Sequence, residues 1–203
     1  MKICICFRGI HFSNDSIQTD FRKSFDHMKK HIIDPFLEQG DSVDILCLTY
    51  NSDILQELLD SYKPVDTVII DPAFRNDGDN WHRQLLWHIM SVDLIQKQNK
   101  EYDFIINTRF DFLFQFKSND SIFDFNKFNI LFQHKSGNCD DNYFALPFTL
   151  ISNFKNACQR MKGERKITHE INRYLEGSII NYAFHLENDC FYEHIYKTNR
   201  SKI

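Results

Sequence analysis

Strand-length apolar runs alternate with segments of helical periodicity through the first half of the chain. This alternation constrains the fold more than any other feature. We expect helices at residues 19–38, 53–62 and 81–98, separating strands at 2–7, 43–49, 67–70 and within 102–116. Such an order favours a mostly parallel, doubly wound sheet, because each helix carries the chain back to begin the next parallel strand.

The second half of the chain is less regular. Helices are expected at 150–161 and at 167–175, the latter ending at Gly177 as a C-cap, with short strands at 128–133, 143–147, 179–184 and 190–194. A chain of 203 residues with no internal repeat or linker has the size of one domain. The sequence therefore predicts a single α/β domain with a central, mostly parallel, mixed sheet flanked by helices.

Composition and charge narrow the class of protein. The chain has 20 Phe against 6 Gly and 4 Pro, which predicts a thick aromatic core and few long loops. The net charge is −4 and the Lys and Arg residues are scattered, so the basic stripe of a nucleic-acid surface is missing. No apolar run approaches the roughly 20 residues of a membrane span. We expect a cytoplasmic protein that binds no nucleic acid and has no transmembrane segment.

The cysteine and histidine patterns give no sign of a metal site or a disulfide framework. Six cysteines contain no CxxC pair, and the chain starts with a strand-like run instead of a signal peptide, so most cysteines are expected to be reduced and buried. His27 and His31, spaced i and i+4 without an HExxH pattern, are expected to form an exposed helix pair. The GxSxG elbow, the Walker loop and the GxGxxG fingerprint are also missing from the sequence.

Charged residues interrupt the apolar run at 102–116, which reads YDFIINTRFDFLFQF. Arg109 and Asp111 fall on the same side of an extended chain. The carboxylate could hold Mg²⁺ or Mn²⁺, and the arginine could neutralise a diphosphate. A plain Arg–Asp pair at a strand end explains the pattern equally well.

Three other segments are candidates for chemistry. Asp77 and Asp79 could hold a divalent cation, although an acidic helix cap is the commoner use of such residues. Asp140 and Asp141 could supply a general base or form a solvated turn, and the turn interpretation is favoured when they are taken alone. Arg8 and Gly9 follow the first strand, where they could border a bound phosphate or form a simple tight turn.

Taken together, the segments KICICFRG, VDILCLTYNSD, YKP, YDFIINTRFDFLF and CDDNYFALPF resemble those of GT-A-type nucleotide-sugar glycosyltransferases. The likeness is to the small viral and bacterial enzymes that build surface polysaccharides or capsid glycans, and it spans roughly residues 2 to 195. It implies a GT-A-like three-layer fold, with a nucleotide-binding half at about 1–116 and an acceptor-side half at about 117–203.

The resemblance also implies roles for individual residues. Asp111 matches the last aspartate of the family's DxD motif, which binds a metal that bridges the diphosphate, but Arg109 stands where the first aspartate is expected. Asp77 and Asp79 form the only literal DxD and rank second as metal ligands. Arg8 and Gly9 match the loop bordering the nucleotide, and Arg83 and Arg109 complete the expected nucleotide-binding set. Asp140 and Asp141 match the acceptor-side acids, with Asp141 preferred as the base if the enzyme inverts.

The implied activity is transfer of a sugar from a UDP- or GDP-sugar to a hydroxyl of a glycan or glycoprotein acceptor, assisted by Mn²⁺ or Mg²⁺. Two alternatives remain open. A metal-independent transferase would rely on Arg8 and Arg109 alone, and a non-catalytic module would bind a nucleotide or glycan without turnover.

Overall fold

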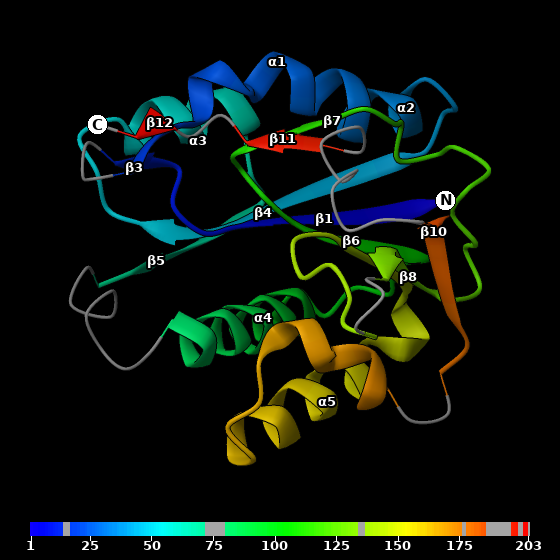
Figure 1. Cartoon of the computed structure of the whole chain (residues 1–203). Helices are drawn as coiled ribbons and strands as arrows, with labels where there is room; N and C mark the ends of the chain where they lie inside the picture. The colour runs from blue at the N-terminus through cyan, green and yellow to red at the C-terminus, as the bar shows by residue number, and fades with distance from the viewer. Residues whose placement is uncertain are drawn as a thin grey trace.

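The computed structural model describes residues 1–13, 17–71, 80–133, 137–175, 178–185, 196–198 and 201–202. Its main sheet has seven strands in the order β10-β8-β9-β6-β1-β4-β5 (Figure 1). β1 (Lys2–Arg8) lies between β4 (Ser42–Tyr50) and β6 (Phe104–Arg109) and is parallel to both. The other members are β5 (Asp66–Ile70), β8 (Phe128–Gln133), β9 (Phe144–Pro147) and β10 (Ile180–His185).

One strand of this sheet runs against the rest. β9 is antiparallel to both β6 and β8, whereas β5 is parallel to β4 and β10 is parallel to β8. The predicted α/β fold with a mostly parallel, mixed central sheet is therefore confirmed. The reversal of β9 has a consequence for the site, because the start of β9 lies beside the ends of its neighbours.

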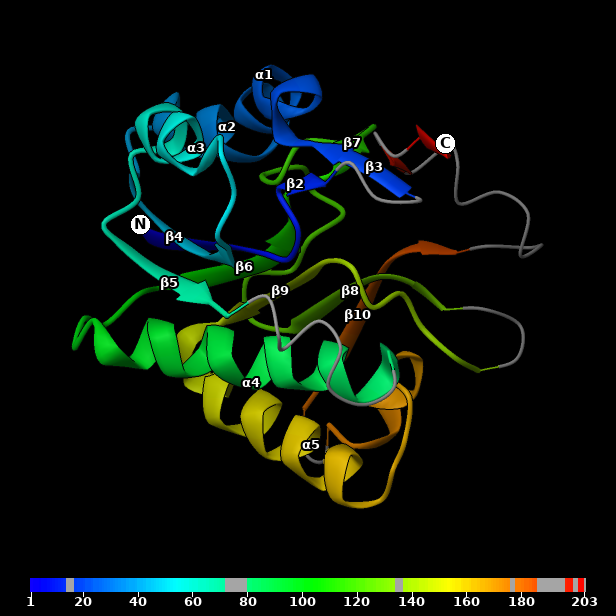
Figure 2. The ribbon, with the colours of Figure 1, turned by 90° about the vertical axis from the view of Figure 1, so that its left-hand side faces the viewer.

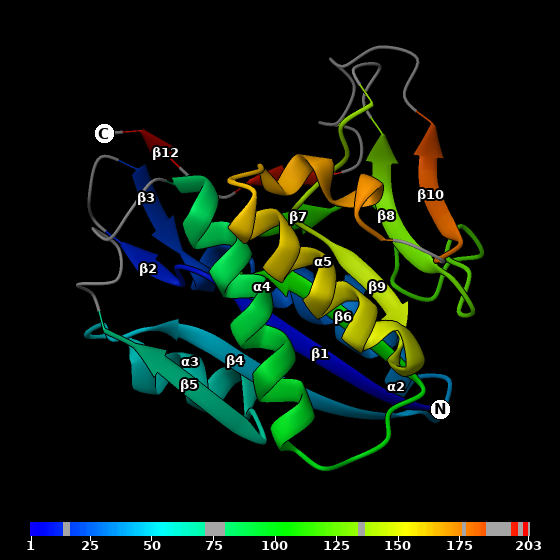
Figure 3. The same ribbon diagram turned by 90° about the horizontal axis from the view of Figure 1, so that it is seen from below.

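Helices cover both faces of the sheet, as Figures 1 and 2 show. One face is covered by α1 (Phe25–Met28), α2 (Asp34–Leu37) and α3 (Leu55–Tyr62). The other face is covered by α4 (Asn80–Lys97) and α5 (Ile151–Gly163), which lie across the strands in Figure 3. Alternate residues of β1 divide between two aromatic-rich cores, since Phe7 packs toward α1–α3 and Cys6 toward α4 and α5.

The cysteines behave as the sequence predicts wherever the structure describes them. Five of the six are free and buried: Cys4, Cys6, Cys47, Cys139 and Cys158. Burial raises the pKa of the Cys6 thiol to about 12, so this residue is an inert apolar side chain. Cys190 lies outside the described residues. Among the described residues, no helix combines the length and the apolar character needed to cross a membrane.

The helix expected at 19–38 is confirmed only from Phe21 to Leu37, as successive 3₁₀, α, π and α stretches. The segment begins as a strand, β3 (Ile17–Asp20), which pairs with β2 (Phe12–Ser13) and β12 (Ser201–Lys202). Asp20 ends that strand, because its side chain accepts a hydrogen bond from the Arg22 amide at 3.1 Å and caps a 3₁₀ turn.

The helical part of this segment is also irregular. A π-helical stretch, Lys29–Ile33, separates α1 from α2 just before Pro35, which has no N–H to donate to the carbonyl of His31. That carbonyl accepts instead from the Ser118 amide at 2.9 Å.

His27 and His31 are not the exposed pair that the spacing predicts. Both are half-buried, with ring centroids 4.1 Å apart. The His27 ring bonds the main-chain carbonyl of Phe114 at 2.6 Å, and the His31 ring bonds that of Phe116 at 3.0 Å. Through these bonds the two histidines connect helix α1 and the π-helical stretch to the segment 114–116, which follows β6.

The strand expected within the apolar run at 102–116 is confirmed as β6. The run then turns at Phe110 and Asp111 before a second strand, β7 (Phe112–Phe114), which pairs with β11 (Tyr196–Thr198) in a separate two-stranded sheet. The Ser24 hydroxyl holds this turn by donating to the Phe110 carbonyl at 2.6 Å. The segment predicted as a helix at 167–175 forms a 3₁₀ helix, Thr168–Arg173. Gly177 and the strand expected at 190–194 lie outside the described residues.

Candidate functional site at the carboxyl edge of the sheet

The order of the strands marks one place on the sheet where ligands are expected. After β1 the chain builds β4 and β5 on one side, and it then returns to place β6 on the other side of β1. The carboxyl ends of β1 and β6 therefore flank a topological switch point, where open α/β sheets bind ligands. Arg8 ends β1, Arg109 ends β6, and the two residues are partners in the β1–β6 register.

The reversed strand brings acidic residues to the same edge. β9 begins at Phe144, which pairs with Asn107 near the end of β6. The segment 140–143 therefore lies at the carboxyl edge beside Arg109, although it is far from Arg109 in sequence. In this way the structure brings the predicted residues Arg8, Arg109, Asp111, Asp140 and Asp141 to one edge.

Arg8 is a buried cation, with only 4 % of its surface exposed. Its Nε donates to the side-chain oxygen of Asn107 at 2.7 Å, and its Nη2 donates to the main-chain carbonyl of Asp141 at 2.8 Å. Among the described residues no carboxylate forms an ion pair with Arg8, and Nη1 has no hydrogen-bond acceptor. Burial first, and then the charge of Arg109, lower the pKa of Arg8 to about 10. A buried charge is costly unless it is paired, hydrogen-bonded or in contact with a ligand, and hydrogen bonds engage two of the three nitrogens of this guanidinium.

Arg109 and Asp111 bind each other. The Arg109 Nε and Nη2 donate to the two carboxylate oxygens of Asp111 at 2.9 and 2.8 Å, and the guanidinium carbon lies 4.9 Å from the centroid of the Phe112 ring. Arg109 Nη1 also donates to the Asn142 side chain at 3.2 Å. Asp111 is 1 % exposed, so its carboxylate is committed to the bidentate pair.

This pairing bears on the predicted metal ion. Both oxygens of Asp111 are engaged by a guanidinium, which leaves a poor donor set for a divalent cation at that position. No group of three or more His, Cys, Asp or Glu side chains placed to hold a metal occurs within the described part of the chain. The other two predicted ligands, Asp77 and Asp79, lie outside the described residues.

Asp140 and Asp141 have different surroundings. Asp140 is a turn residue, because its carboxylate accepts from the main-chain amides of Asn142 and Tyr143, both at 3.2 Å, and from the Asn142 side chain at 2.9 Å. The Asp141 carboxylate instead lies 3.8 Å from the Nε2 atom of His169. Both aspartates are buried, and Asp141 lies next to a second titratable side chain, that of His169.

Two histidines of the site were not among the predicted residues. His88 is fully buried on α4 against Phe144 and Phe154, and burial together with the charge of Arg8 lowers its pKa well below the ordinary value. Its position could have been found from sequence, because it shares the i, i+3, i+4 stripe of Leu85 and Val92. No pattern in the sequence marks His169 in this way, because its contact with Asp141 depends on tertiary structure.

A chain of hydrogen bonds fixes the loop after β1. The Thr49 hydroxyl donates to the Gly9 carbonyl at 2.8 Å, so its oxygen accepts from Nδ1 of His11 at 2.6 Å. His11 Nε2 then accepts from the Ser52 hydroxyl at 2.7 Å. Burial lowers the pKa of His11 to about 4, which agrees with a neutral ring in this chain.

Gly9 and Arg83 complete the predicted set. Gly9 has φ +105°, and no atom lies within 4 Å of the position that a Cβ would take, so its backbone conformation is what requires glycine. Arg83 is half-buried near the start of α4, and the neighbouring Gln84 accepts from the Thr168 hydroxyl at 2.7 Å.

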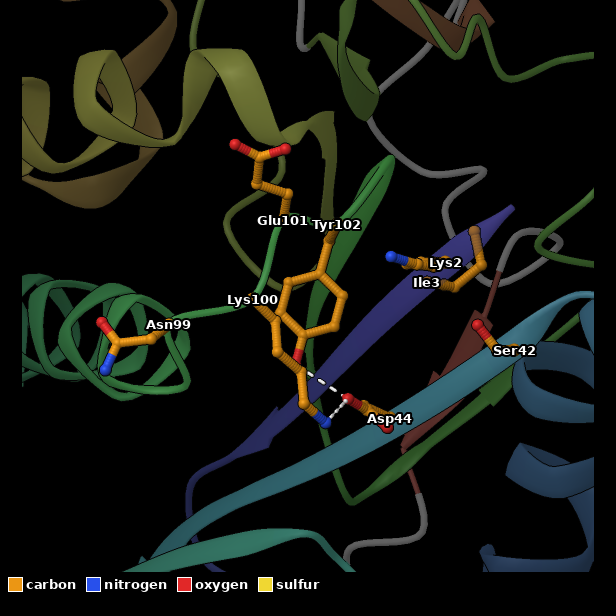
Figure 4. Close-up of a pocket in the computed structure, with 8 residues that line it drawn as sticks. All are labelled: Lys2, Ile3, Ser42, Asp44, Asn99, Lys100, Glu101 and Tyr102. Atoms are coloured by element: carbon orange, nitrogen blue, oxygen red, sulfur yellow. Dashed lines mark hydrogen bonds and ion pairs between the residues drawn. The ribbon is translucent and has the colours of Figure 1, made fainter.

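A pocket of about 550 Å³ lies at the opposite, amino edge of the sheet (Figure 4). Its lining includes the starts of β1 and β4 and the segment after α4: Lys2, Ile3, Ser42, Asp44, Asn99, Lys100, Glu101 and Tyr102. The Asp44 carboxylate accepts from Lys100 at 2.7 Å and from the Tyr102 hydroxyl at 2.9 Å. Asp44 and Lys100 form an exposed ion pair, so this pocket differs from the carboxyl edge, where Arg8 is buried without a carboxylate partner among the described residues.

A comparison of the sequence with models of known protein families finds no match, and a comparison with curated proteins finds none either. Function must therefore be argued from the carboxyl edge itself.

Proposed function

We propose that the protein is a glycosyltransferase of GT-A type that moves a sugar from a nucleoside-diphosphate donor to a hydroxyl of a glycan or glycoprotein acceptor. The observation that carries the proposal is the register pairing of Arg8 with Arg109 at the switch point of the sheet. Two guanidinium groups on adjacent strand ends suit a diphosphate, which spreads its negative charge over several oxygens.

The surroundings of the arginine pair support this proposal. The mostly parallel, mixed sheet between two helical layers is the architecture that the GT-A resemblance implies. The acidic segment before β9 reaches the same edge from the other side, where an acceptor could meet the donor. The segments that carry the resemblance thus lie together in space, although they are spread along the sequence.

The chemistry requires two kinds of group at this edge. The bond between the sugar's anomeric carbon and the diphosphate breaks, and Nη1 of Arg8 together with Arg109 would stabilise the departing charge. The acceptor oxygen forms the new bond, and its proton would pass to Asp141 as general base. Mn²⁺ or Mg²⁺ remains a prediction that depends on Asp77 and Asp79, so we derive no step through a metal.

Donor hydrolysis tests the proposal without knowledge of the acceptor, because water replaces the acceptor hydroxyl. We expect the protein to release UDP or GDP from at least one member of a panel of UDP- and GDP-sugars. Nucleoside diphosphates should also raise its melting temperature, because ligands that bind the native state stabilise it. Stabilisation without turnover would favour the non-catalytic binding module, and the absence of both effects would refute the proposal.

A further inference from the structure

His169 lies next to the carboxylate that we propose as the base. Its Nε2 atom is 3.8 Å from Oδ2 of Asp141, and the two side chains are 31 % and 4 % exposed, respectively. Asp141 is thus the inner member of the pair, and His169 is the member that solvent can reach.

The hydrogen bonds of His169 fix which ring nitrogen carries the proton. Nδ1 lies 2.9 Å from the carbonyl oxygen of Cys139, and a carbonyl only accepts, so Nδ1 donates there. The Cys139 amide returns a bond to the His169 carbonyl at 2.7 Å. When the ring is neutral, Nε2 is therefore its basic nitrogen, and this is the atom that lies beside Asp141.

The 3₁₀ helix that carries His169 is held in place by its neighbours. Thr168 donates to Gln84 of α4 at 2.7 Å, and Asn172 donates to the Gly137 carbonyl at 3.1 Å and to the Tyr182 hydroxyl at 3.0 Å. His169 is thus fixed in position relative to Asp141. Nε2 and Oδ2 lie 3.8 Å apart, which is longer than a hydrogen bond, and the contacts between catalytic groups often tighten to hydrogen-bond length only when substrate binds.

We infer that His169 and Asp141 form a proton-accepting pair, in which His169 removes from Asp141 the proton taken from the acceptor hydroxyl. The inference rests on the proposed glycosyl transfer. As the acceptor oxygen bonds to the anomeric carbon and the diphosphate leaves with its electron pair, the hydroxyl proton passes to Oδ2 of Asp141. It then moves to Nε2 of His169 and from there to solvent, which restores both groups.

The direction of this transfer follows from exposure. The side chain of Asp141 is 4 % exposed, whereas that of His169 is 31 % exposed, so solvent can take the proton from the histidine. The resulting imidazolium and carboxylate attract each other across the pair. His169 acts through Asp141 in this scheme, so it is a positioning and proton-accepting residue that need not touch the sugar.

The substitution His169→Asn tests the inference. The asparagine amide can keep the donor to the Cys139 carbonyl while Nε2 is removed. We expect kcat for donor hydrolysis to fall about 100-fold, with KM for the donor unchanged, because general-base contributions are of that size. His31→Asn is the matched control, since His31 also bonds a main-chain carbonyl, that of Phe116, through Nδ1. It should leave kcat unchanged.

Two further measurements separate a proton-accepting role from a structural one. Imidazole added to the medium should restore activity to His169→Gly but not to Asp141→Asn. Nitrogen-15 spectra of the wild-type protein should show neutral His169 protonated on Nδ1. Protonation on Nε2 instead would overturn the inference whether or not any donor is turned over.

The outcomes distinguish the two proposals. If the wild-type protein hydrolyses a donor and His169→Asn does so equally fast, the proton-accepting pair is refuted and the transferase stands. If the wild-type protein hydrolyses no UDP- or GDP-sugar, the proposed function fails and the proton-accepting pair fails with it.

Discussion

Charged side chains are exposed and paired at the amino edge of the sheet, and they are buried at its carboxyl edge. At the amino edge, Lys100 and Asp44 pair at the surface, with side chains 53 % and 24 % exposed. At the carboxyl edge, Arg8 is 4 % exposed without a carboxylate partner in the described structure, and Asp111 and Asp141 are 1 % and 5 % exposed. Surface pairs cost and contribute little, whereas buried charges need a compensating partner. The open pocket therefore lies at the amino edge, whereas the buried charged side chains that a ligand could compensate lie at the carboxyl edge.

The largest difference between the edges should appear when one member of an ion pair is removed. Asp111→Asn leaves Arg109 without its bidentate partner, and we expect a loss of about 3–5 kcal/mol in the free energy of unfolding. Asp44→Asn at the amino edge should cost about 1 kcal/mol or less. Denaturant unfolding of both variants measures the contrast, and equal losses would show that burial does not separate the two edges.

The next contrast concerns pH. His11 has a folded pKa of about 4, below the ordinary 6.5, so the unfolded chain binds more protons between these values. Stability is therefore full above pH 6.5 and falls as the pH drops toward 4, by up to about 3 kcal/mol for this residue. His88, whose pKa is also lowered, adds to the same slope.

The measurement is the free energy of unfolding at a series of pH values. His11→Asn should flatten the dependence between pH 6.5 and 4, whereas Lys100→Met at the amino edge should leave it unchanged. A wild-type stability that stays constant over this range would contradict the neutral state of the two buried histidines.

A smaller effect is expected on nucleotide binding. Arg8→Met removes a charged donor from the switch point, and we expect affinity for UDP or GDP to fall about 10- to 100-fold, the equivalent of about 1.5–3 kcal/mol. Lys100→Met is again the control and should bind as the wild type does. Calorimetric titration measures both, and it would place the nucleotide at the amino edge if the two variants behaved in the opposite way.

The smallest effect is expected from metal removal. If Arg8 and Arg109 hold the diphosphate, as we propose, nucleoside diphosphates should still raise the melting temperature in the presence of EDTA. Thermal unfolding with EDTA and with added Mn²⁺ checks this. A rise in melting temperature that requires Mn²⁺ would instead assign the diphosphate charge to a metal, with Asp77 and Asp79 as the first ligands to substitute.

The apolar periodicity of the sequence predicts where helices and strands lie better than it predicts where they end or become irregular. The strand predicted at 128–133 has those bounds, because five consecutive residues of this short run are buried. The helix predicted at 81–98 is shifted by one residue. The helix predicted at 19–38 begins only after Asp20 and becomes irregular before Pro35, because a side-chain cap and a missing amide override a continuous apolar period.

The site was predictable only in part for a related reason. Arg109 and Asp111 are two residues apart, so their pairing could be anticipated from sequence, and it is the Arg–Asp pair considered there that the structure shows. Arg8 and Asp141, whose carbonyl accepts from the Arg8 guanidinium, are 133 positions apart in the sequence. The contact of Asp141 with His169 depends on how the helical segment at Thr168–Arg173 packs in the fold, and a local pattern does not give that packing.

The reversal of β9 has an evolutionary consequence. Arg8 and Arg109 reach the edge as strand ends whose register is locked by the central sheet, whereas the acidic segment enters the same edge as the lead-in to a strand running the other way. Insertions or deletions ahead of β9 can reshape one side of the edge and leave the arginine pair in place. If the proposed sugar transfer holds, such a layout would let acceptor preference diverge between descendants of one ancestor while the donor side stays constant.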